Sequence, residues 1–407
     1  MATIPSSTPP APPEVHPGFL YGRVTTLTGA TYEGRLRWGG DQEAFWGDYF
    51  NGQKKENPWA ALVPPGRLPK TRGTVSFFGL EFAEPEREAD LTRLFMARMG
   101  DIARVQAQGK DVLVTLKSGT VFALDRLEAS DFDDGLRVWD EKKGVVDLDS
   151  SLVRSVELLP AGPTSGAPAR LHGTVRTKAG AFTGFLQWGR TRCVGTDELA
   201  ASDGKGIRFD AIRSIARRAE GGLLVTRADG GEVEVAGTGD REQGTYVDDP
   251  RYGRVLVSTA AFERLDLGPA DSGPGYGDFP PGRPLAGAVT TRDGRRLEGR
   301  IVFDLDESET TETLDAPAEG VDYTIPFGLV ASIEPQAGAP GGAGPVQVAL
   351  RGGEELRFEP KGDLGKRNAG LLVFAAGSDR PVYVAWGEVA RIDFEGSEAP
   401  SQPGAKQ

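Results

Sequence analysis

The sequence has 407 residues, of which 38% are apolar and 26% charged, and its formal net charge is −12. This acidic balance excludes a general attraction to nucleic acid phosphates or anionic lipid as the main activity. One cysteine and two histidines exclude an intrachain disulfide, a multi-cysteine metal site and a histidine-rich zinc site. The 56 glycines and 29 prolines indicate many turns, and the length suits about two to four domains of an all-β protein.

The first 18 residues are rich in proline, serine and threonine, so we expect residues 1–18 to form a disordered tail. They contain neither the basic nor the apolar region of a secretory signal. No window of the sequence approaches the ~18 uninterrupted apolar residues of a membrane span. Together with the single cysteine, these features favour a cytoplasmic location.

Three later segments, at 21–38, 172–188 and 286–303, share one pattern. Each has a valine, then a turn glycine, and then a run in which an apolar residue, a glycine, an apolar residue and an aromatic residue alternate with other residues. Strict period two predicts a half-buried strand that follows a hairpin. The glycines within the runs are Gly34, Gly184 and Gly299, and the runs end in Trp38, Trp188 and Phe303, which we expect in the core.

Further landmarks follow each segment in the same order: apolar residues three apart, a hairpin around a turn glycine, and a closing apolar run with identical offsets. The apolar triplets predict a strand that joins a short helical turn. We therefore predict three tandem β units that share a core pattern, with Pro/Gly-rich linkers between them and a polar disordered tail at the end. The boundaries are 19–159, 160–169 (linker), 170–267, 268–284 (linker), 285–395 and 396–407 (tail).

The first unit is longer than the others because it contains an insertion at 44–95. Near its end, Leu91, Leu94 and Phe95 have helical spacing and predict a helix that caps one face or one end of the unit. Aromatic residues near Lys54 and Lys55 suit either a recognition surface or a small satellite core, and the satellite core is favoured. This candidate binding surface comprises Phe45, Trp46, Tyr49, Phe50 and Trp59.

Other polar residues predict no catalytic or metal-binding site and no cofactor. The aspartate-rich runs at 131–134, 147–149 and 304–307 lack the glycine and glutamate positions of an EF-hand, so we expect solvated loops. His172 lacks triad partners at recognisable positions. Cys193 lies near Arg190 and Arg192, which would favour a reactive thiolate, although a half-buried strand thiol is the favoured interpretation.

The repeated run V-x-T-x-x-G, followed by an alternating strand and by a closure such as IRFDAIRSI, resembles small five-stranded barrels of the Sm-like and PRC-type class. The resemblance implies that Gly34, Gly184 and Gly299 let a strand bend as the sheet curls. Each unit would then be one larger barrel or sandwich, or a pair of small Sm-like barrels. Sm-like proteins bind RNA through loop residues, but residues that would do so are not identifiable in this sequence.

The leading hypothesis for function is a non-enzymatic binding or scaffold protein, whose partner is an unknown protein or polymer ligand. One alternative, implied by the Sm-like resemblance, is binding of RNA or single-stranded nucleic acid, which the acidic charge disfavours. A second alternative is a hydrolase with a site between units, which a cluster of perturbed carboxylates in a cleft would favour.

Overall fold

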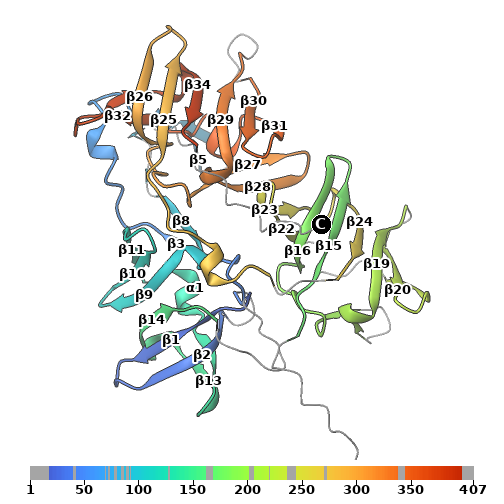
Figure 1. The fold of residues 1–407 in the computed structure, drawn as a ribbon. Coiled ribbons are helices and arrows are strands. Elements are labelled where there is room, and N and C mark those ends of the chain that lie inside the picture. The colour runs from blue at the N-terminus through green and yellow to red at the C-terminus, as the bar shows by residue number, and fades with distance from the viewer. Residues whose placement is uncertain are drawn as a thin grey trace, which may run out of the picture.

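The computed structural model consists of antiparallel β-sheets joined by turns and short helical segments (Figure 1). It describes residues 18–39, 43–68, 70–71, 74–77, 80–83, 87–88, 91, 93–126, 129–161, 168–200, 206–219, 221–235, 244–269, 273–337 and 344–396. The predicted all-β class is confirmed, since the α-helix among these residues, α1 (Ser130–Asp133), has four residues. The tails predicted at 1–18 and 396–407 lie outside the described residues except where they border the sheets.

The first sheet has eight strands in the order β11-β10-β9-β14-β1-β2-β12-β13. Buried and exposed side chains alternate along β1 and β2, so that Val24 and Leu36 face a common core. The strands are β1 (Tyr21–Thr26), β2 (Thr31–Trp38), β9 (Ile102–Gln108), β10 (Asp111–Leu116), β11 (Val121–Asp125), β12 (Leu136–Asp140), β13 (Gly144–Leu148) and β14 (Val153–Leu158).

The second sheet has ten strands in the order β21-β20-β19-β24-β15-β16-β22-β23-β28-β27. Its last two strands, β27 (Thr313–Ala318) and β28 (Val321–Pro326), come from the segment that also forms the third sheet. The other strands are β15 (His172–Thr177), β16 (Gly180–Trp188), β19 (Ile212–Arg217), β20 (Leu223–Arg227), β21 (Glu232–Val235), β22 (Thr245–Asp249), β23 (Gly253–Val257) and β24 (Phe262–Leu267).

The third sheet has eight strands in the order β31-β30-β29-β34-β25-β26-β32-β33. When strands are matched by their succession along each segment, this is the order of the first sheet and of the first eight strands of the second. The strands are β25 (Ala286–Thr291), β26 (Arg296–Val302), β29 (Val330–Pro335), β30 (Val346–Leu350), β31 (Glu355–Phe358), β32 (Leu371–Phe374), β33 (Val382–Val384) and β34 (Val389–Phe394).

One glycine in each sheet permits a close approach between two backbones. A Cβ atom at Gly34 would lie 1.9 Å from the carbonyl oxygen of Trp139, and one at Gly299 would lie 1.9 Å from that of Phe374. Gly184 has the same 1.9 Å relation to a carbonyl oxygen of β22. Any side chain at these positions would push the neighbouring strand away, which explains why the sequence pattern has glycine there.

Of the predicted barrel or sandwich units, the barrels are wrong for the described strands, because no closed barrel forms, and the sandwich stays a prediction. In the first sheet, the terminal strands β11 and β13 do not pair with each other, and the outer edge of β11 forms a bridge between Leu124 and Lys54 of the insertion. In the second sheet, β23 pairs with β28 and not with β21, so that this sheet does not close either. The aromatic residues that end the repeated runs are buried as expected: Trp38, Trp188 and Phe303.

Short helical turns lead into strands at equivalent places, as the apolar triplets predict. For example, η2 (Met99–Asp101) leads directly into β9, and η4 (Phe209–Ala211) leads into β19. The remaining turns are η1 (Ala60–Leu62), η3 (Ser150–Leu152), η6 (Tyr276–Asp278), η7 (Phe327–Leu329), η8 (Gly362–Leu364) and η9 (Trp386–Glu388).

The helix predicted within the insertion is wrong at its C-terminal end, where residues 94–98 form a strand. There β8 (Leu94–Arg98) pairs antiparallel with β3 (Tyr49–Gln53). Phe95 and Ala97 are buried while Leu94 is 81% exposed, so the governing period is two and not 3.6. Other short pairs are β4 (Lys70–Thr71) with β7 (Arg87–Glu88), β5 (Thr74–Phe77) with β6 (Leu80–Ala83), and β17 (Glu198–Leu199) with β18 (Ile207–Arg208).

Part of the linker predicted at 268–284 packs on the first sheet. Phe279 is buried in the core of that sheet, and Tyr276 donates a hydrogen bond of 2.7 Å to the Ile102 carbonyl. Lys117 Nζ donates to the carbonyl oxygens of Tyr276 and Phe279 at 2.6 and 2.8 Å. The polypeptide between the second and third sheets therefore helps to hold them against the first.

Candidate functional site

The predicted binding surface of five aromatic residues lies largely inside the molecule. Trp46 and Phe50 are fully buried, as is Phe45, and Tyr49 is 4% exposed. Trp46 lies 4.5 Å from the ring of Tyr276, which comes from the linker. These four side chains thus contact other parts of the chain, and a recognition role for them stays a prediction.

Trp59, the fifth member of that set, is partly exposed and lies over the third sheet. Its ring is 6.3 Å from that of Phe374 in an edge-to-face arrangement, and the guanidinium of Arg300 is 5.4 Å from its centre. Val63 and Leu91, also from the insertion, complete the apolar cluster on this face. The insertion of the first segment therefore covers one face of the third sheet.

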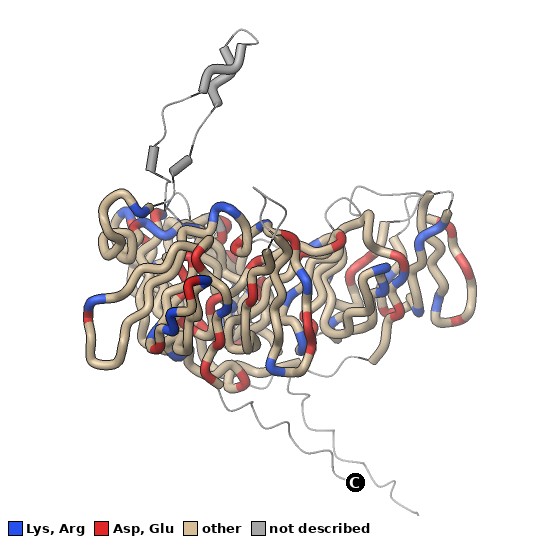
Figure 2. Tube along the Cα trace, turned by 90° about the horizontal axis from the view of Figure 1, so that it is seen from above, with Lys and Arg blue, Asp and Glu red and all other residues tan. Residues whose placement is uncertain are grey.

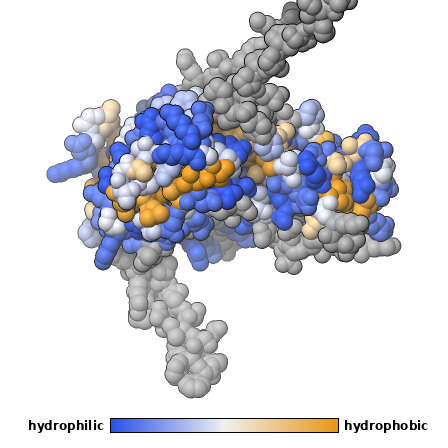
Figure 3. Space-filling view, turned by 90° about the horizontal axis from the view of Figure 1, so that it is seen from below, coloured by the Kyte–Doolittle hydropathy of each residue, from blue (hydrophilic) through white to orange (hydrophobic). Residues whose placement is uncertain are grey.

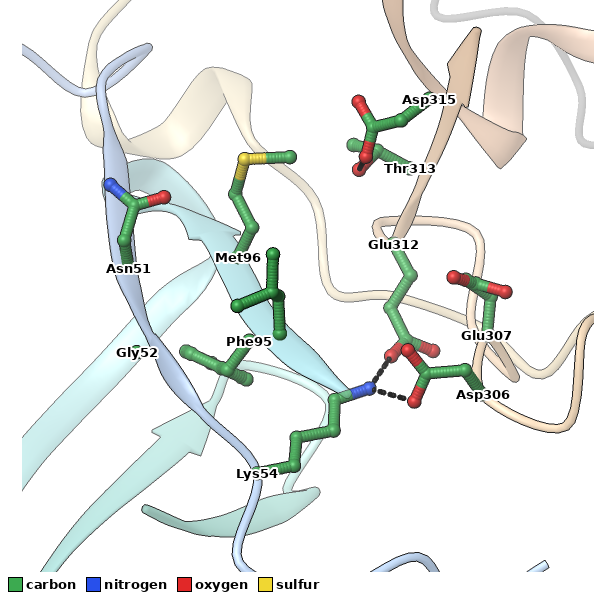
Figure 4. Close-up of a pocket in the computed structure, with 11 residues that line it drawn as sticks. Asn51, Gly52, Lys54, Phe95, Met96, Asp306, Glu307, Glu312, Thr313 and Asp315 are labelled. Atoms are coloured by element: carbon green, nitrogen blue, oxygen red, sulfur yellow. Dashed lines mark hydrogen bonds and ion pairs between the residues drawn. The ribbon is translucent and has the colours of Figure 1, made fainter. Parts of the chain in front are cut away.

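A pocket of about 150 Å³ lies between the insertion and the third segment (Figure 4). On one side, Asn51 of β3, Lys54 just after it and Met96 of β8 line the pocket, together with other insertion residues. The opposite side is formed by β27 and the loop before it, and carries Asp306, Glu307, Glu312, Thr313 and Asp315.

Lys54 crosses this boundary as the centre of a buried ion-pair group. Its Nζ lies 2.7 Å from Asp306 Oδ1 and 3.1 Å from Glu312 Oε1, and its side chain is 11% exposed. Burial alone would lower the pKa of Lys54, but the carboxylates of Glu312 and Asp306 raise it above its ordinary value. Lys54 is therefore charged and ties the insertion to the third segment.

The carboxyl groups near Lys54 are buried together. Burial raises the pKa of Asp304 to about 7, and it raises the pKa values of Asp306 and Glu307 above their ordinary range. Glu307 Oε2 is buried without a hydrogen-bond partner among the described residues. This is the kind of carboxylate cluster that the hydrolase alternative requires.

Several of these carboxylates nevertheless hold the backbone or Lys54 in place. Glu312 Oε2 accepts hydrogen bonds from the amides of Ser308 and Glu309 at 2.6 and 3.0 Å. Asp304 accepts from the amide of Ala369. Within the ranges that the structure describes, no group of three or more His, Cys, Asp or Glu residues could hold a metal ion. The observed geometry accounts for the cluster as an anchor between two segments.

A second buried ion pair joins the insertion to the second sheet. Arg254 of β23 donates to Asp48 Oδ1 at 2.8 Å and to Asp248 Oδ1 at 2.8 Å. Burial would lower the pKa of Arg254, but Asp248 and Asp48 raise it well above the ordinary value. The Arg254 guanidinium also lies 5.0 Å from the ring centres of Tyr49 and Tyr246. The insertion thus covers part of the second sheet as well.

Cys193 lies in the same boundary and is buried, with 2% exposure. Burial raises the pKa of its thiol to about 12, and the nearby Asp48 carboxylate adds to the effect. The arginine that opposes this shift most strongly is Arg170, not Arg190 or Arg192. The thiol is therefore protonated and enclosed, which disfavours the reactive-thiolate interpretation. The ring of His172 packs edge-on against Phe185, with 5.4 Å between their centres.

The covered faces described above belong to equivalent three-stranded parts of the sheets. We call β2, β12 and β13 the first ribbon, β16, β22 and β23 the second ribbon, and β26, β32 and β33 the third ribbon. In each ribbon one face packs into the core and the other, the outer face, points away from it. The outer faces of the second and third ribbons are covered by the insertion.

Among the described residues, the outer face of the first ribbon is more open than the other two and carries arginines around a tryptophan, with Phe19 against Arg35. Arg35 and Trp139 are cross-strand partners, and the guanidinium stacks 3.9 Å from the centre of the ring. The guanidinium of Arg137 lies 5.9 Å from the centre of the same ring, and Arg37 is the cross-strand partner of Arg137. Val145, opposite Trp139 on β13, is 58% exposed. This surface was not predicted from the sequence.

Charged residues are spread over the whole described chain, whereas a band of exposed apolar side chains lies on one side of it. In Figure 2, basic and acidic residues are interspersed along the described chain, so the net negative charge is not confined to one region. Figure 3 shows a band of apolar side chains on the side of the first sheet. The large apolar residues of this sheet and its turns that are exposed are Leu27, Val121, Val145 and Leu152.

Comparison with known proteins gives no relative. No family model matches the chain, and neither a curated protein nor a solved structure matches it. Among the described residues, no helix has both the length and the apolar character needed to cross a membrane.

Proposed function

We propose that this chain is a non-enzymatic binding protein built from three related β units in tandem, and that the outer face of the first ribbon is its recognition surface. The observation that carries this proposal is that, among the described residues, the insertion covers the outer faces of the second and third ribbons but not that of the first. A partner would occupy on the first ribbon the place that the insertion and β28 occupy on the others.

Two structural features support the tandem arrangement. The three large sheets share one order of eight strands, although the second sheet continues into β28 and β27. Gly34, Gly184 and Gly299 permit the same close approach to the carbonyl oxygen of the neighbouring strand. Units that agree in strand order and in these backbone contacts are suited to a scaffold in which the outer faces specialise.

The arginine–tryptophan pair supports recognition because such residues dominate binding energy in protein interfaces. A stacked guanidinium loses little conformational entropy on binding, since Trp139 already restrains it. The adjacent Val145 adds exposed apolar area at the edge of the sheet. The partner is an unknown protein or polymer ligand, and the tests below distinguish these classes.

Site-specific photo-crosslinking in an extract of the native host tests this function. The photoreactive residue p-benzoyl-phenylalanine is placed at Val145, and a matched control has it at Val121, which is 54% exposed on the opposite edge of the same sheet. We expect an adduct from position 145 that disappears with Arg35→Glu, and no such adduct from position 121. Identical adducts from both positions, or none from 145, would contradict the proposal.

A further inference from the structure

We infer that the partner presents an extended segment containing acidic and aromatic side chains, which adds to the edge of β13 and covers the Arg35–Trp139 stack. This inference rests on the proposed function and specifies its partner. Three features of the molecule lead to it: the charge of the open face, the way in which the equivalent stack is covered, and the way in which the equivalent edge is paired.

On the open face it is the charge of Arg35 that calls for a carboxylate, because Arg137 beside it already pairs with Asp147 at 2.6 Å. Arg35 takes part in no ion pair among the described residues; its neighbours are the rings of Phe19 and Trp139 and the like charge of Arg37. Burial and Arg37 lower the pKa of Arg35. On the second ribbon, the outward arginine is Arg254, and Asp48 of the insertion supplies a carboxylate that pairs with it. A carboxylate from a partner would play the same part beside Arg35.

The third ribbon shows what kind of side chain covers such a stack. Arg300 and Phe374 are cross-strand partners at the place that Arg35 and Trp139 hold in the first ribbon, and their guanidinium-to-ring distance is also 3.9 Å. Trp59 of the insertion covers this pair. An aromatic residue on the partner segment would cover the Arg35–Trp139 pair in the same way.

The second ribbon shows how the edge can be used. Its strand β23 holds the place of β13, and it pairs antiparallel with β28, with Val255 opposite Tyr323 and Leu256 opposite Asp322. The strand that occupies this edge thus itself carries an aromatic and an acidic residue. β13 ends the strand order of the first sheet, so its outer edge is placed to accept an extended strand by β-augmentation.

The chain's own ends do not have this composition. Residues 1–17 contain one acidic residue, Glu14, and no Phe, Tyr or Trp, and residues 397–407 contain one, Glu398, and again no such aromatic residue. The acidic and aromatic stretch at 45–50 is buried in its own molecule, so a second copy cannot offer it without unfolding. These facts disfavour the two ends and residues 45–50 as the source of the segment. Residues 77–88 of the insertion also combine phenylalanines with glutamates, and the dimer outcome of the test below detects a second copy that offers them.

The test uses the full chain and three synthetic peptides of equal length, with binding measured by fluorescence anisotropy at low and at moderate salt. The first peptide alternates Asp or Glu with Trp and Val. The second replaces the acids by Lys, and the third replaces Trp by Ala. We expect the first peptide to bind at least about tenfold more tightly than the other two, and salt to weaken it.

Variants locate the site of that binding. Arg35→Glu and Val145→Asp should each weaken the first peptide by about tenfold or more, whereas Val121→Asp should leave its affinity unchanged. Circular dichroism and thermal melting establish that each variant folds, and Arg35→Lys, which keeps the charge, should retain part of the affinity. Equal binding of all three peptides, or equal effects at positions 121 and 145, would overturn the inference.

Other occupants give different outcomes, each of which contradicts the inference. A single-stranded oligonucleotide that binds more tightly than the acidic peptide would identify a nucleic acid site. Concentration-dependent dimers that Val145→Asp abolishes would identify a second copy. A gain of peptide affinity on deletion of residues 1–17 would identify the chain's own tail as the occupant. A crosslinked partner at position 145 without an acidic and aromatic segment would leave the proposed function standing and remove this inference.

Discussion

The third and first ribbons contain the same cross-strand pair in two different settings. Arg300 stacks on Phe374 at 3.9 Å, and Arg35 stacks on Trp139 at the same distance. The insertion covers the Arg300–Phe374 pair of the third ribbon but not the Arg35–Trp139 pair of the first. Equivalent strands therefore do not imply equivalent roles. The covered outer face helps to hold the molecule together, and the open one is the recognition surface that we propose.

The largest effect on stability should come from the ion pair between Lys54 of the insertion and the third segment. Lys54→Met removes the cation and leaves Asp306 and Glu312 buried without it, so the free energy of unfolding should fall by about 3–5 kcal/mol in urea denaturation. The exposed pair of Lys55 with Asp111 is the control, and Lys55→Met should cause no measurable change. Equal midpoints for both variants would show that Lys54 does not anchor the insertion.

Truncation of the two stacked aromatic residues compares the settings directly. Phe374→Ala should lower the free energy of unfolding by about 3 kcal/mol, because the side chain is buried in a packed cluster. Trp139→Ala should cost less than about 1 kcal/mol, because its ring is partly exposed. The same denaturation experiment measures both. A larger loss for Trp139 than for Phe374 would mean that the first ribbon is not an open face.

The carboxylates on the covered side should make the anchor sensitive to pH. The pKa of Asp304 is about 7 in the folded chain, above its ordinary value, so the folded state binds more protons between about pH 4 and 7. The contribution of Asp304 to stability should therefore fall as the pH rises through this window and then level off. Asp304→Asn should reduce this fall in thermal melts between pH 5 and 8. An unchanged pH profile in the variant would exclude Asp304 as the source.

The smallest effect concerns Cys193, which lies under Phe45 at the boundary of the insertion and the second sheet. Because the thiol is buried and its pKa is raised to about 12, a disulfide reagent should modify it slowly in native buffer at pH 8 and rapidly in urea. Lys54→Met, if it loosens the insertion, should increase the native rate modestly. Rapid labelling of the unmodified chain would show that this boundary opens readily.

The strands of the large sheets could be predicted well from the sequence because their apolar residues alternate with period two. Period two and the positions of Gly34, Gly184 and Gly299 reflect constraints within each sheet, and such local constraints are visible in a single sequence. The helix expected near Leu94 failed because apolar residues at 91, 94 and 95 fit a helix, while Phe95 and Ala97 actually alternate in a strand. The pairing of β8 with β3 favours the strand period of two over the helical period of 3.6.

The sites could be predicted far less completely. The contacts of Lys54 with Asp306 and Glu312 join residues more than 250 positions apart, and no sequence spacing reveals them. Arg35 and Trp139 could have been found by aligning the three repeated runs and comparing their outward positions, where Phe185 and Arg300 correspond to Arg35. That the insertion covers two of the three outer faces needed the structure.

Hydrogen exchange with and without the acidic and aromatic peptide tests the central claim most directly, because β-augmentation protects backbone amides at one edge. With the peptide at a saturating concentration, amides of β13 should exchange at least about tenfold more slowly, and those of β11, at the other edge of the same sheet, should be unaffected. Unchanged exchange in β13, or equal protection of β11, would contradict the claim that the first ribbon is an open face completed by a partner strand.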